Sequence, residues 1–423
     1  MLNRKLPPTI RMDEPIHLNR PNKYTLDNGI DVYEINMGTQ EVLKLEVVFR
    51  AGRPFEDKKL VARATADQLK EGTQNYSAAA IAEHFDFYGS TLSLPFNLDS
   101  ANVVFYCITK HFEKIIPVLA DILNNPTFPE HELQSFIQRN QQRLSVDLSK
   151  NDVLAYRKIT EVIFGEQHPY GYNSFPETYA TLERNDLIRH FRKNYTAENC
   201  FILVSGKTNE QIIKLLNQYL GQAIPNGKKV AVSLPNIKNP VESIKIDRPD
   251  TVQTAIRIGR KLFNRHHPDY MGIYVLNTVL GGYFGSRLMN NIREDKGFTY
   301  NIYSLVDSMQ YGGCFYIGTE VGNDFVEDTI TEIYREMDQL RQEPIEAEEL
   351  DMVKNYLLGF YLTLVDGPFN VAEVVKAQIT DSLPLDFFEN LVENTRQTGP
   401  EDLQKLAQKY LDKADMWEVI VGC

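Results

Sequence analysis

The two halves of this chain follow the same pattern, and this internal repeat constrains the fold more than any other feature of the sequence. Each half ends in a helical pattern that leads into a short apolar run and closes on a glycine. The tyrosine before the run precedes that glycine by eleven residues in the first copy, Tyr195 to Gly206, and by twelve in the second, Tyr410 to Gly422. Such self-similarity predicts one structural plan used twice.

Earlier segments of the two halves also correspond. Each half has an alternating apolar strand followed by a helix, then a second strand, then helices that open with acidic residues. In the first half these are residues 43–49, a helix from about Lys59, residues 103–108 and PEHELQSF from Pro129; in the second they are the strand around Ile256 and Ile258, a helix from near Pro268, residues 314–318 and PIEAEELDMV from Pro344.

The sequence therefore predicts two tandem homologous α+β domains. We expect each to be a mixed, mostly antiparallel sheet with helices packed on one face, and hairpin signals such as Asp27-Asn28-Gly29 agree with this. The boundaries that we predict are residues 1–220 for the first domain, a linker at 221–244 that is rich in Pro, Gly and Lys, and 245–423 for the second domain.

The charge and the cysteines restrict the partners and the compartment. The net charge of −12 argues against nucleic acid as the main partner, which requires a basic face. No apolar stretch is long enough to span a membrane. The first residues lack the apolar core of a signal peptide, and the four cysteines are widely spread. We therefore expect a cytoplasmic protein.

A duplicated α+β domain that begins with an LDNGI strand, from Leu26, resembles the pitrilysin or insulinase-like zinc peptidases. The chain is most similar to the smaller members that look like mitochondrial processing peptidase and work as pairs of chains. The resemblance extends from about Tyr24 to the end of the sequence. It implies the processing-peptidase-like metallohydrolase fold, with a chamber that holds unfolded peptides.

The metal-binding motif of that family is missing from this chain. Catalytic members carry H-x-x-E-H on a helix, so that two histidines on one face bind zinc beside a glutamate base. In the matching stretch, VARATADQLKEGT, these positions are Arg63, Ala66 and Asp67, and the distant glutamate ligand falls near Gln141 and Gln142. The resemblance thus implies no zinc in this chain and a zinc ion in a homologous partner subunit.

Arg63 and Asp67 lie four residues apart, so on a helix they face the same side. Two interpretations remain open from the sequence. The side chains could form an ion pair where the zinc would be, or they could be two solvated charges, which exposed pairs often are.

A second block, LGGYFGSRLMNNIREDKGFTYNIYS from Leu280, looks like the signature of the family's second domain. Its glycines, Gly281, Gly282 and Gly285, predict a flexible bend, and the resemblance suggests that they contact substrate. We expect a helix over Ser286–Lys296, ended by a left-handed cap at Gly297, and a strand from Phe298 to Leu305.

Within this block, the resemblance assigns catalytic roles to Arg293 and Tyr300. In the family, an arginine and a tyrosine at this spacing reach the zinc site of another domain. The guanidinium can bind a substrate carbonyl or carboxylate, and the hydroxyl can donate to the oxyanion formed on peptide cleavage. The alternative is structural, since an arginine stabilises a helix C-terminus and a tyrosine is common in strands.

These features together predict the non-catalytic subunit of a heterodimeric zinc peptidase, inactive alone and able to form a homodimer in isolation. Its partners would be a zinc-bearing homologue and unfolded peptide substrates. One alternative is a purely structural core subunit derived from the same family. Another is a peptidase with an unfamiliar metal site.

Overall fold

The first half of the chain forms a six-stranded sheet in the order β1-β2-β6-β3-β5-β4. The computed structural model describes residues 15–235, 237 and 239–422. Strands β2 and β6 are parallel, and the other neighbouring strands are antiparallel. The strands are β1 (Asn22–Thr25), β2 (Asp31–Asn36), β3 (Val42–Phe49), β4 (Thr91–Ser93), β5 (Ala101–Ile108) and β6 (Cys200–Gly206).

The second half repeats this plan in a five-stranded sheet of order β7-β11-β8-β10-β9. In both sheets the last strand in sequence has one parallel neighbour, which is β2 for β6 and β7 for β11. The predicted α+β class and the two mixed sheets are confirmed. The strands are β7 (Ser243–Asp247), β8 (Gln253–Leu262), β9 (Ile302–Met309), β10 (Gly312–Gly322) and β11 (Trp417–Gly422).

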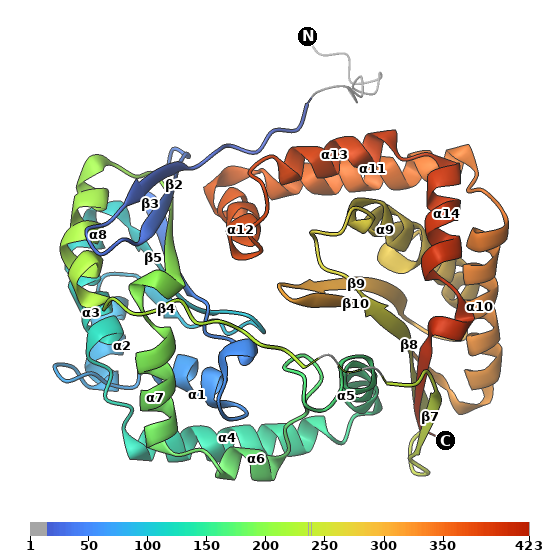
Figure 1. Ribbon diagram of the computed structural model, residues 1–423, viewed down its shortest axis with the longest axis horizontal. Helices are drawn as coiled ribbons and strands as arrows, with labels where there is room; N and C mark the ends of the chain where they lie inside the picture. The colour runs from blue at the N-terminus through green and yellow to red at the C-terminus, as the bar shows by residue number, and fades with distance from the viewer. Residues whose placement is uncertain (1–14, 236, 238, 423) are drawn as a thin grey trace.

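The helices surround the two sheets, as Figure 1 shows. Helices α3 and α8 lie outside the first sheet and α10 lies outside the second, while α4 runs along one side of the molecule and α11 and α13 along the other. The helices of the first half are α1 (Val61–Gln68), α2 (Ala78–Phe87), α3 (Phe112–Asn124), α4 (Glu130–Asp147), α5 (Asn151–Phe164), α6 (Pro176–Ala180), α7 (Arg184–Asn194) and α8 (Glu210–Ala223). Those of the second half are α9 (Tyr270–Asn277), α10 (Val326–Gln342), α11 (Ala347–Leu364), α12 (Gly367–Thr380), α13 (Phe387–Gln397) and α14 (Pro400–Tyr410).

Alternation along β3 explains why this strand has two different faces. Leu43, Leu45, Val47 and Phe49 are fully buried in the core beneath α3 and α8. Because successive side chains point to opposite faces, Lys44, Glu46 and Val48 face the other side of the sheet. That second face also needs a cover, since these three side chains are buried as well.

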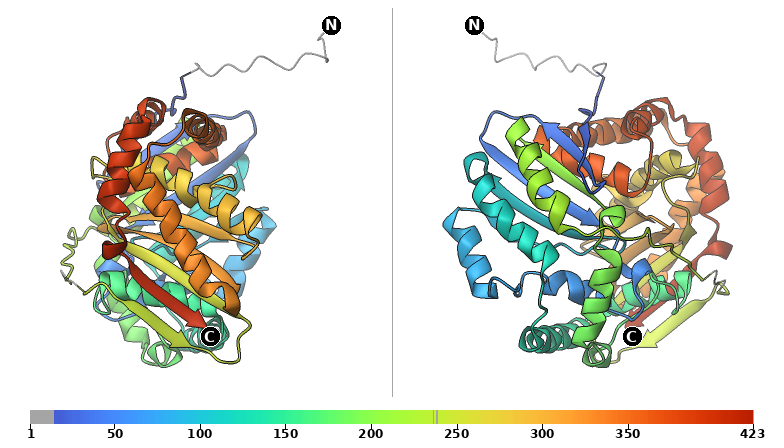
Figure 2. Two further views of the ribbon diagram at one scale, coloured as in Figure 1. Left: turned by 90° about the vertical axis from the view of Figure 1, so that its right-hand side faces the viewer. Right: turned by 60° about the vertical axis from the view of Figure 1, so that its left-hand side comes forward.

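In each half, the second face of the sheet is covered by a helix that belongs to the other half (Figures 1 and 2). Helix α5 packs on β8 and β11, and α12 packs on β6 and β2. Ile159 and Phe164 of α5 share a core with Trp417 and Val419, for example. The sequence predicts that each sheet has helices of its own half on one face. It does not predict this exchange, because an apolar helix face does not reveal which sheet the helix covers.

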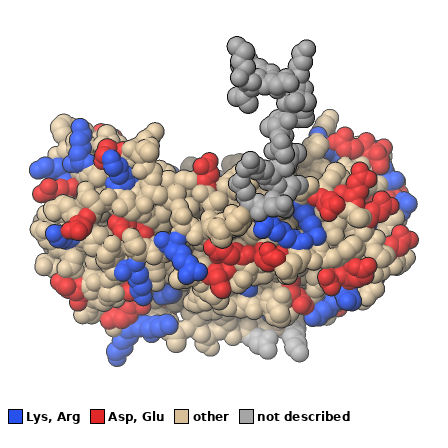
Figure 3. All heavy atoms as spheres, turned by 90° about the horizontal axis from the view of Figure 1, so that it is seen from above, with Lys and Arg blue, Asp and Glu red and all other residues tan. Residues whose placement is uncertain are grey.

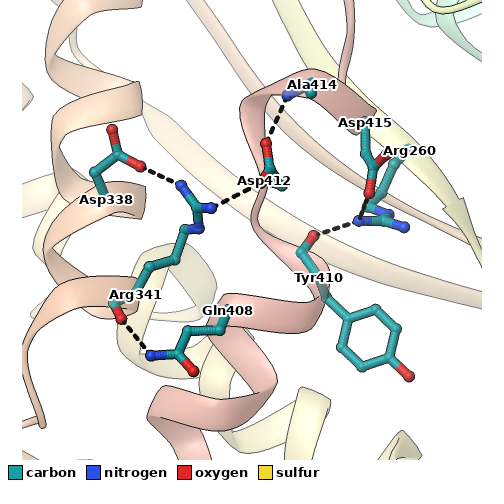
Figure 4. A network of polar contacts seen from close by, with 8 residues as sticks. All are labelled: Arg260, Asp338, Arg341, Gln408, Tyr410, Asp412, Ala414 and Asp415. Carbon is teal, nitrogen blue, oxygen red and sulfur yellow. Dashed lines mark hydrogen bonds and ion pairs between the residues drawn. The ribbon is translucent and has the colours of Figure 1, made fainter.

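A polar network joins the end of the second repeat to the rest of its half (Figure 4). Arg341 of α10 donates to Asp338 and to Asp412, each at 2.7 Å, and so holds the turn after α14. Arg260 of β8 donates to Asp415 at 2.8 Å and to the carbonyl of Tyr410 at 3.0 Å. These contacts guide the chain from α14 into β11.

Two surface properties bear on the sequence analysis. No helix in the described part of the chain is long and apolar enough to cross a membrane. Acidic and basic side chains are interspersed over the face of the molecule that Figure 3 shows.

Candidate functional site

Helix α1, which carries the degenerate metal motif, starts from an unusual loop. Leu60, the residue before the helix, has a left-handed backbone with φ of 72°, which is rare for a bulky residue. The loop allows the Glu56 carboxylate to fold back, where it accepts a hydrogen bond from the backbone N–H of Ala62 at 3.0 Å. A carboxylate at this end of a helix is favourable, because the first N–H groups have no partner within the helix.

Arg63 and Asp67 both line a cavity of about 590 Å³ beside α1. They form no ion pair with each other within the described part of the chain. Arg63 instead donates a long hydrogen bond of 3.5 Å to the Tyr179 hydroxyl. Ala66, at the position of the catalytic glutamate, is buried in the core of the first half and adds no polar atom to the cavity.

The position expected for the distant metal ligand is occupied by an amide that serves the structure. Gln141 of α4 donates to the carbonyl of Pro176 at 2.9 Å and thereby joins α4 to α6. Over residues 15–235, 237 and 239–422, no three or more His, Cys, Asp or Glu side chains are grouped so as to hold a metal ion.

Two further residues of the cavity come from distant parts of the sequence. The Arg53 guanidinium lies 4.5 Å from the centre of the Tyr172 ring, and Lys59 approaches the same ring at 5.0 Å. The Tyr172 hydroxyl donates to Glu56 at 2.7 Å. Burial raises the pKa of Glu56 to about 7, although this hydrogen bond favours the ionised form. Nothing in the sequence indicated that Arg53 and Tyr172 would meet α1.

The glycine-rich segment of the second half continues α9 as a π-helical turn, η4 (Thr278–Gly282). Gly281 is buried here, and a Cβ atom at this position would lie 2.6 Å from the backbone nitrogen of Ser304 in β9. A side chain therefore does not fit. Gly282 is exposed, whereas a Cβ on Gly285 would meet the ring of Tyr283 at 2.8 Å.

The helix that follows differs from the predicted one in its winding. Residues Met289–Asp295 form a second π-helical segment, η5. The predicted left-handed cap is confirmed, since Gly297 has φ of 67° and Phe298 N–H bonds the carbonyl of Ile292 at 3.1 Å. A wider helical turn of this kind is often found at functional sites.

The strand expected from Phe298 starts later, at Ile302. Phe298 does not pair in the sheet but stacks on Phe325, with ring centres 4.8 Å apart. The Thr299 hydroxyl donates to the carbonyl of Glu320 at 2.7 Å. Tyr300 thus belongs to a short connection held at both ends.

Charged contacts fix η5 against α10 and α11. Arg287 forms a bidentate pair with Glu349, with distances of 2.8 and 2.7 Å. Asn291 donates to Glu332 at 2.8 Å and to Glu336 at 2.7 Å. Bidentate pairs of this kind set orientation as well as position, so the contacts of Arg287, just before η5, and of Asn291 within it make this helical segment a rigid platform.

Arg293 lies within this platform and Tyr300 follows it, and few contacts are made by either side chain. The Arg293 guanidinium lies 4.5 Å from the centre of the exposed Phe284 ring, and its Nε is 3.6 Å from the adjacent Glu294. Tyr300 is 90% exposed. Within the described residues, its hydroxyl forms no hydrogen bond. The structure therefore exposes Tyr300 to water, whereas the Arg293 side chain is 30% exposed and packs on Phe284, a contact that the resemblance did not supply.

The chain is similar to several known proteins. Residues 181–357 match the family model described as peptidase M16 inactive domain. The chain is 25% identical over 342 residues to an uncharacterized zinc protease, YmxG, of Bacillus subtilis, covering 80% of this chain and 82% of that protein. It is 25% identical over 293 residues to a probable mitochondrial-processing peptidase subunit beta of Schizosaccharomyces pombe, covering 66% and 62%.

A solved structure shows the same fold over nearly the whole length. The crystal structure of a peptidase M16 inactive domain from Pseudomonas fluorescens superposes with a TM-score of 0.88 at 23% sequence identity. The match covers 95% of this chain and 98% of that one. The predicted two-domain α+β fold is confirmed by this likeness.

Proposed function

Because the chain belongs to the peptidase M16 family, of which it is an inactive member, we propose that it is the non-catalytic subunit of a two-chain zinc peptidase. One similar protein is named a zinc protease and another a processing-peptidase subunit. The partner would be a homologue with an intact H-x-x-E-H motif. The two chains would enclose a chamber in which unfolded peptides are cut.

The residues at the degenerate motif do not fit zinc. A divalent cation needs deprotonated imidazole or carboxylate ligands at this site. The helix face that would hold them offers Arg63, whose positive charge repels a metal ion, and Asp67. The buried methyl group of Ala66 cannot act as a base. We therefore derive no cleavage step from this chain alone.

The observation that supports the proposal is the exposure of Tyr300, on the segment that follows η5 and its half-buried Arg293. A tyrosine side chain with 90% of its surface in water contributes little to the stability of its own fold. It nevertheless follows a tightly fixed helix, where η5 is held by Arg287 and Asn291. Functional groups carried on a rigid support with free polar ends are suited to complete a site on another molecule.

In the paired enzyme each group would have a separate role. The planar guanidinium of Arg293 would bind a peptide carbonyl or carboxylate and so position the substrate. The hydroxyl of Tyr300 would donate a hydrogen bond to the oxygen that becomes negatively charged when the peptide bond is attacked. Both roles need the partner's active site to lie close to the end of η5.

Mixing the two purified chains tests this proposal. A zinc-bearing homologue is assayed with a quenched fluorescent peptide, alone and with this chain, and complex formation is followed by analytical ultracentrifugation. We expect a mixed complex whose turnover exceeds the sum of the separate chains by about ten- to a thousandfold, as expected for restored oxyanion stabilisation. Turnover equal to that sum would reject the proposal.

A structural core subunit without a catalytic role is the second candidate. It would also form a complex, but Arg293 and Tyr300 would be dispensable there. The same assay separates the two candidates, because a scaffold subunit retains full activity of its assembly when these side chains are altered.

A further inference from the structure

The cavity beside α1 contains two arginines whose charges the surrounding protein does not neutralise. Arg53 and Arg63 both line it. Arg53 donates to the carbonyl of Pro169 at 3.4 Å, and Arg63 to the hydroxyl of Tyr179 at 3.5 Å, both long for hydrogen bonds. In the ranges that the structure describes, neither guanidinium forms an ion pair.

Arg53 is held in place without an ion pair in the described part of the chain. Its backbone N–H donates to the carbonyl of Leu98 at 2.7 Å, and its guanidinium packs against the Tyr172 ring. Contact with the face of the ring leaves the N–H groups at the edge of the guanidinium available. The arginine is thus oriented before any ligand arrives.

Glu56 and Asp67 form no ion pair with either arginine among the described residues. Glu56 directs its oxygens to Ala62 N–H and to the Tyr172 hydroxyl, and burial raises its pKa to about 7. Asp67 lines the cavity but is exposed to water and has Gln68 as its hydrogen-bond partner at 3.2 Å. The charged side chains lining the cavity are therefore two arginines and one aspartate.

The charge of Arg53 also acts on a third arginine, Arg157 of α5. Burial lowers the pKa of Arg157, and the charge of Arg53 lowers it further. Arg157 is anchored by its hydrogen bond to the carbonyl of Ser174. The carboxylate of Glu161 acts in the opposite direction and raises the pKa of Arg157.

We propose that this cavity is a carboxylate-binding site, in which Arg53 and Arg63 bind an acidic group of a peptide held in the chamber. The inference rests on the proposed function, because it assumes that the chamber binds peptides. The paired guanidinium groups offer several N–H donors to one carboxylate. Leu94 and Phe96 line the same cavity and supply an apolar wall for the neighbouring carbon atoms of the peptide.

A peptide can present a carboxylate at its C-terminus or on an Asp or Glu side chain, and binding to the isolated chain distinguishes them. A short fluorescent peptide is prepared with a free C-terminus, with a C-terminal amide, and with the amide plus one internal Gln→Glu change. Fluorescence anisotropy should show that one of the two carboxylate forms binds about tenfold more tightly than the uncharged amide. Equal affinity of all three peptides would overturn the proposal.

Substitutions test which side chains cause this preference. Arg63→Gln and Arg53→Gln should each remove most of it, and Asp67→Asn should strengthen it, because one repelling charge is lost. Arg143→Gln is the matched control, since Arg143 is an arginine of α4 whose side chain is 76% exposed. Circular dichroism checks folding, and Arg63→Gln is decisive because it does not disturb the Arg53–Tyr172 contact. An Arg63→Gln variant that keeps the preference would contradict the assignment.

The binding assay uses no partner chain, so its result is independent of the turnover assay. Tyr300→Phe should leave the carboxylate preference unchanged. If the mixed complex proves inactive while the carboxylate preference is present, the proposed function fails and the carboxylate site stands. If turnover rises but the carboxylate preference is absent, the carboxylate site fails and the proposed function stands.

Discussion

Glu46 and Arg257 occupy equivalent places in the two sheets and carry opposite charges. Glu46 of β3 lies opposite Leu203, three residues before Gly206, and Arg257 of β8 lies opposite Val419, three residues before Gly422. Glu46 accepts a hydrogen bond from Lys376 of α12 at 2.9 Å. Arg257 donates to Asp152 of α5. Each buried charge thus binds the helix that crosses from the other half.

Removing Glu46 should loosen the contact between the halves. Glu46 is 2% exposed and also pairs with Lys44, which is almost as deeply buried. Glu46→Ala leaves Lys44 with Glu373 alone, and loss of one partner from a buried ion pair costs about 3–5 kcal/mol. Urea unfolding should show this loss, whereas Glu210→Ala, in a surface pair, should leave the midpoint unchanged. Equal midpoints for both variants would contradict a stabilising role for the buried contacts of Glu46 with Lys44 and Lys376.

Three glycines should respond differently to alanine. Gly281→Ala places Cβ against the backbone of Ser304 and should cost about 2 kcal/mol or more. Gly297→Ala has free space but a left-handed backbone, with a cost of about 1–2 kcal/mol. Gly359→Ala, in the middle of α11 with free space around it, should stabilise by about 0.5–1 kcal/mol. Thermal unfolding measures all three, and a tolerated Gly281→Ala would refute the packing described at η4.

The stability of the first half should depend on pH through Glu56. Its pKa rises from 4.5 to about 7 on folding, mainly because burial disfavours the charged carboxylate. Between these values the unfolded chain has lost the proton and the folded chain keeps it, so rising pH destabilises the protein. The contribution is absent below pH 4.5, grows to about 3 kcal/mol near pH 7, and is then constant.

Glu56→Gln isolates this effect, because glutamine does not titrate, keeps one oxygen to accept from the Ala62 N–H, and offers an amide N–H to the Tyr172 hydroxyl oxygen. The free energy of unfolding of the variant, relative to the unaltered protein, should therefore increase as pH rises from 4.5 to 7. Glu210→Gln, on an exposed side chain, serves as the control. Parallel stability curves for Glu56→Gln and the unaltered chain would show that Glu56 is not buried as described.

Arg293→Lys tests the need for a planar donor group. Lysine keeps the charge but cannot donate two parallel hydrogen bonds from one planar group. In the mixed complex we expect turnover to fall by about tenfold, the loss expected for one charge-assisted hydrogen bond. Unaltered turnover with lysine would mean that only the charge matters at this position.

The repeat allowed much of the fold to be predicted. The correspondence of Tyr195–Gly206 with Tyr410–Gly422 placed β6 and β11, and apolar alternation placed β3 and β8. These signals are local, so they appear in a single sequence. The exchange of α5 and α12 depends on contacts between elements far apart in the sequence, such as α5 with β11 and α12 with β2, and no local pattern encodes it.

In the candidate sites too, features set by local sequence could be predicted and those set by distant residues could not. Gly297 could be assigned as a helix cap from its place after a charged helix, and it has the expected backbone. The arginine pair of the cavity could not be found, because Arg53 is oriented by Tyr172, a residue more than a hundred positions away. The π-helical winding of η5 also leaves no distinct mark in the sequence.

The most direct test of the account is the turnover of a quenched peptide by the mixed complex when Tyr300 is replaced by Phe. The change removes one hydroxyl from an exposed side chain, so folding and assembly should be unaffected. Tyr76→Phe, on a partly exposed tyrosine of the first half, is the control. We predict that turnover falls by about ten- to a thousandfold with Tyr300→Phe alone. Equal turnover for Tyr300→Phe, Tyr76→Phe and the unaltered complex would contradict the claim that this chain completes its partner's active site.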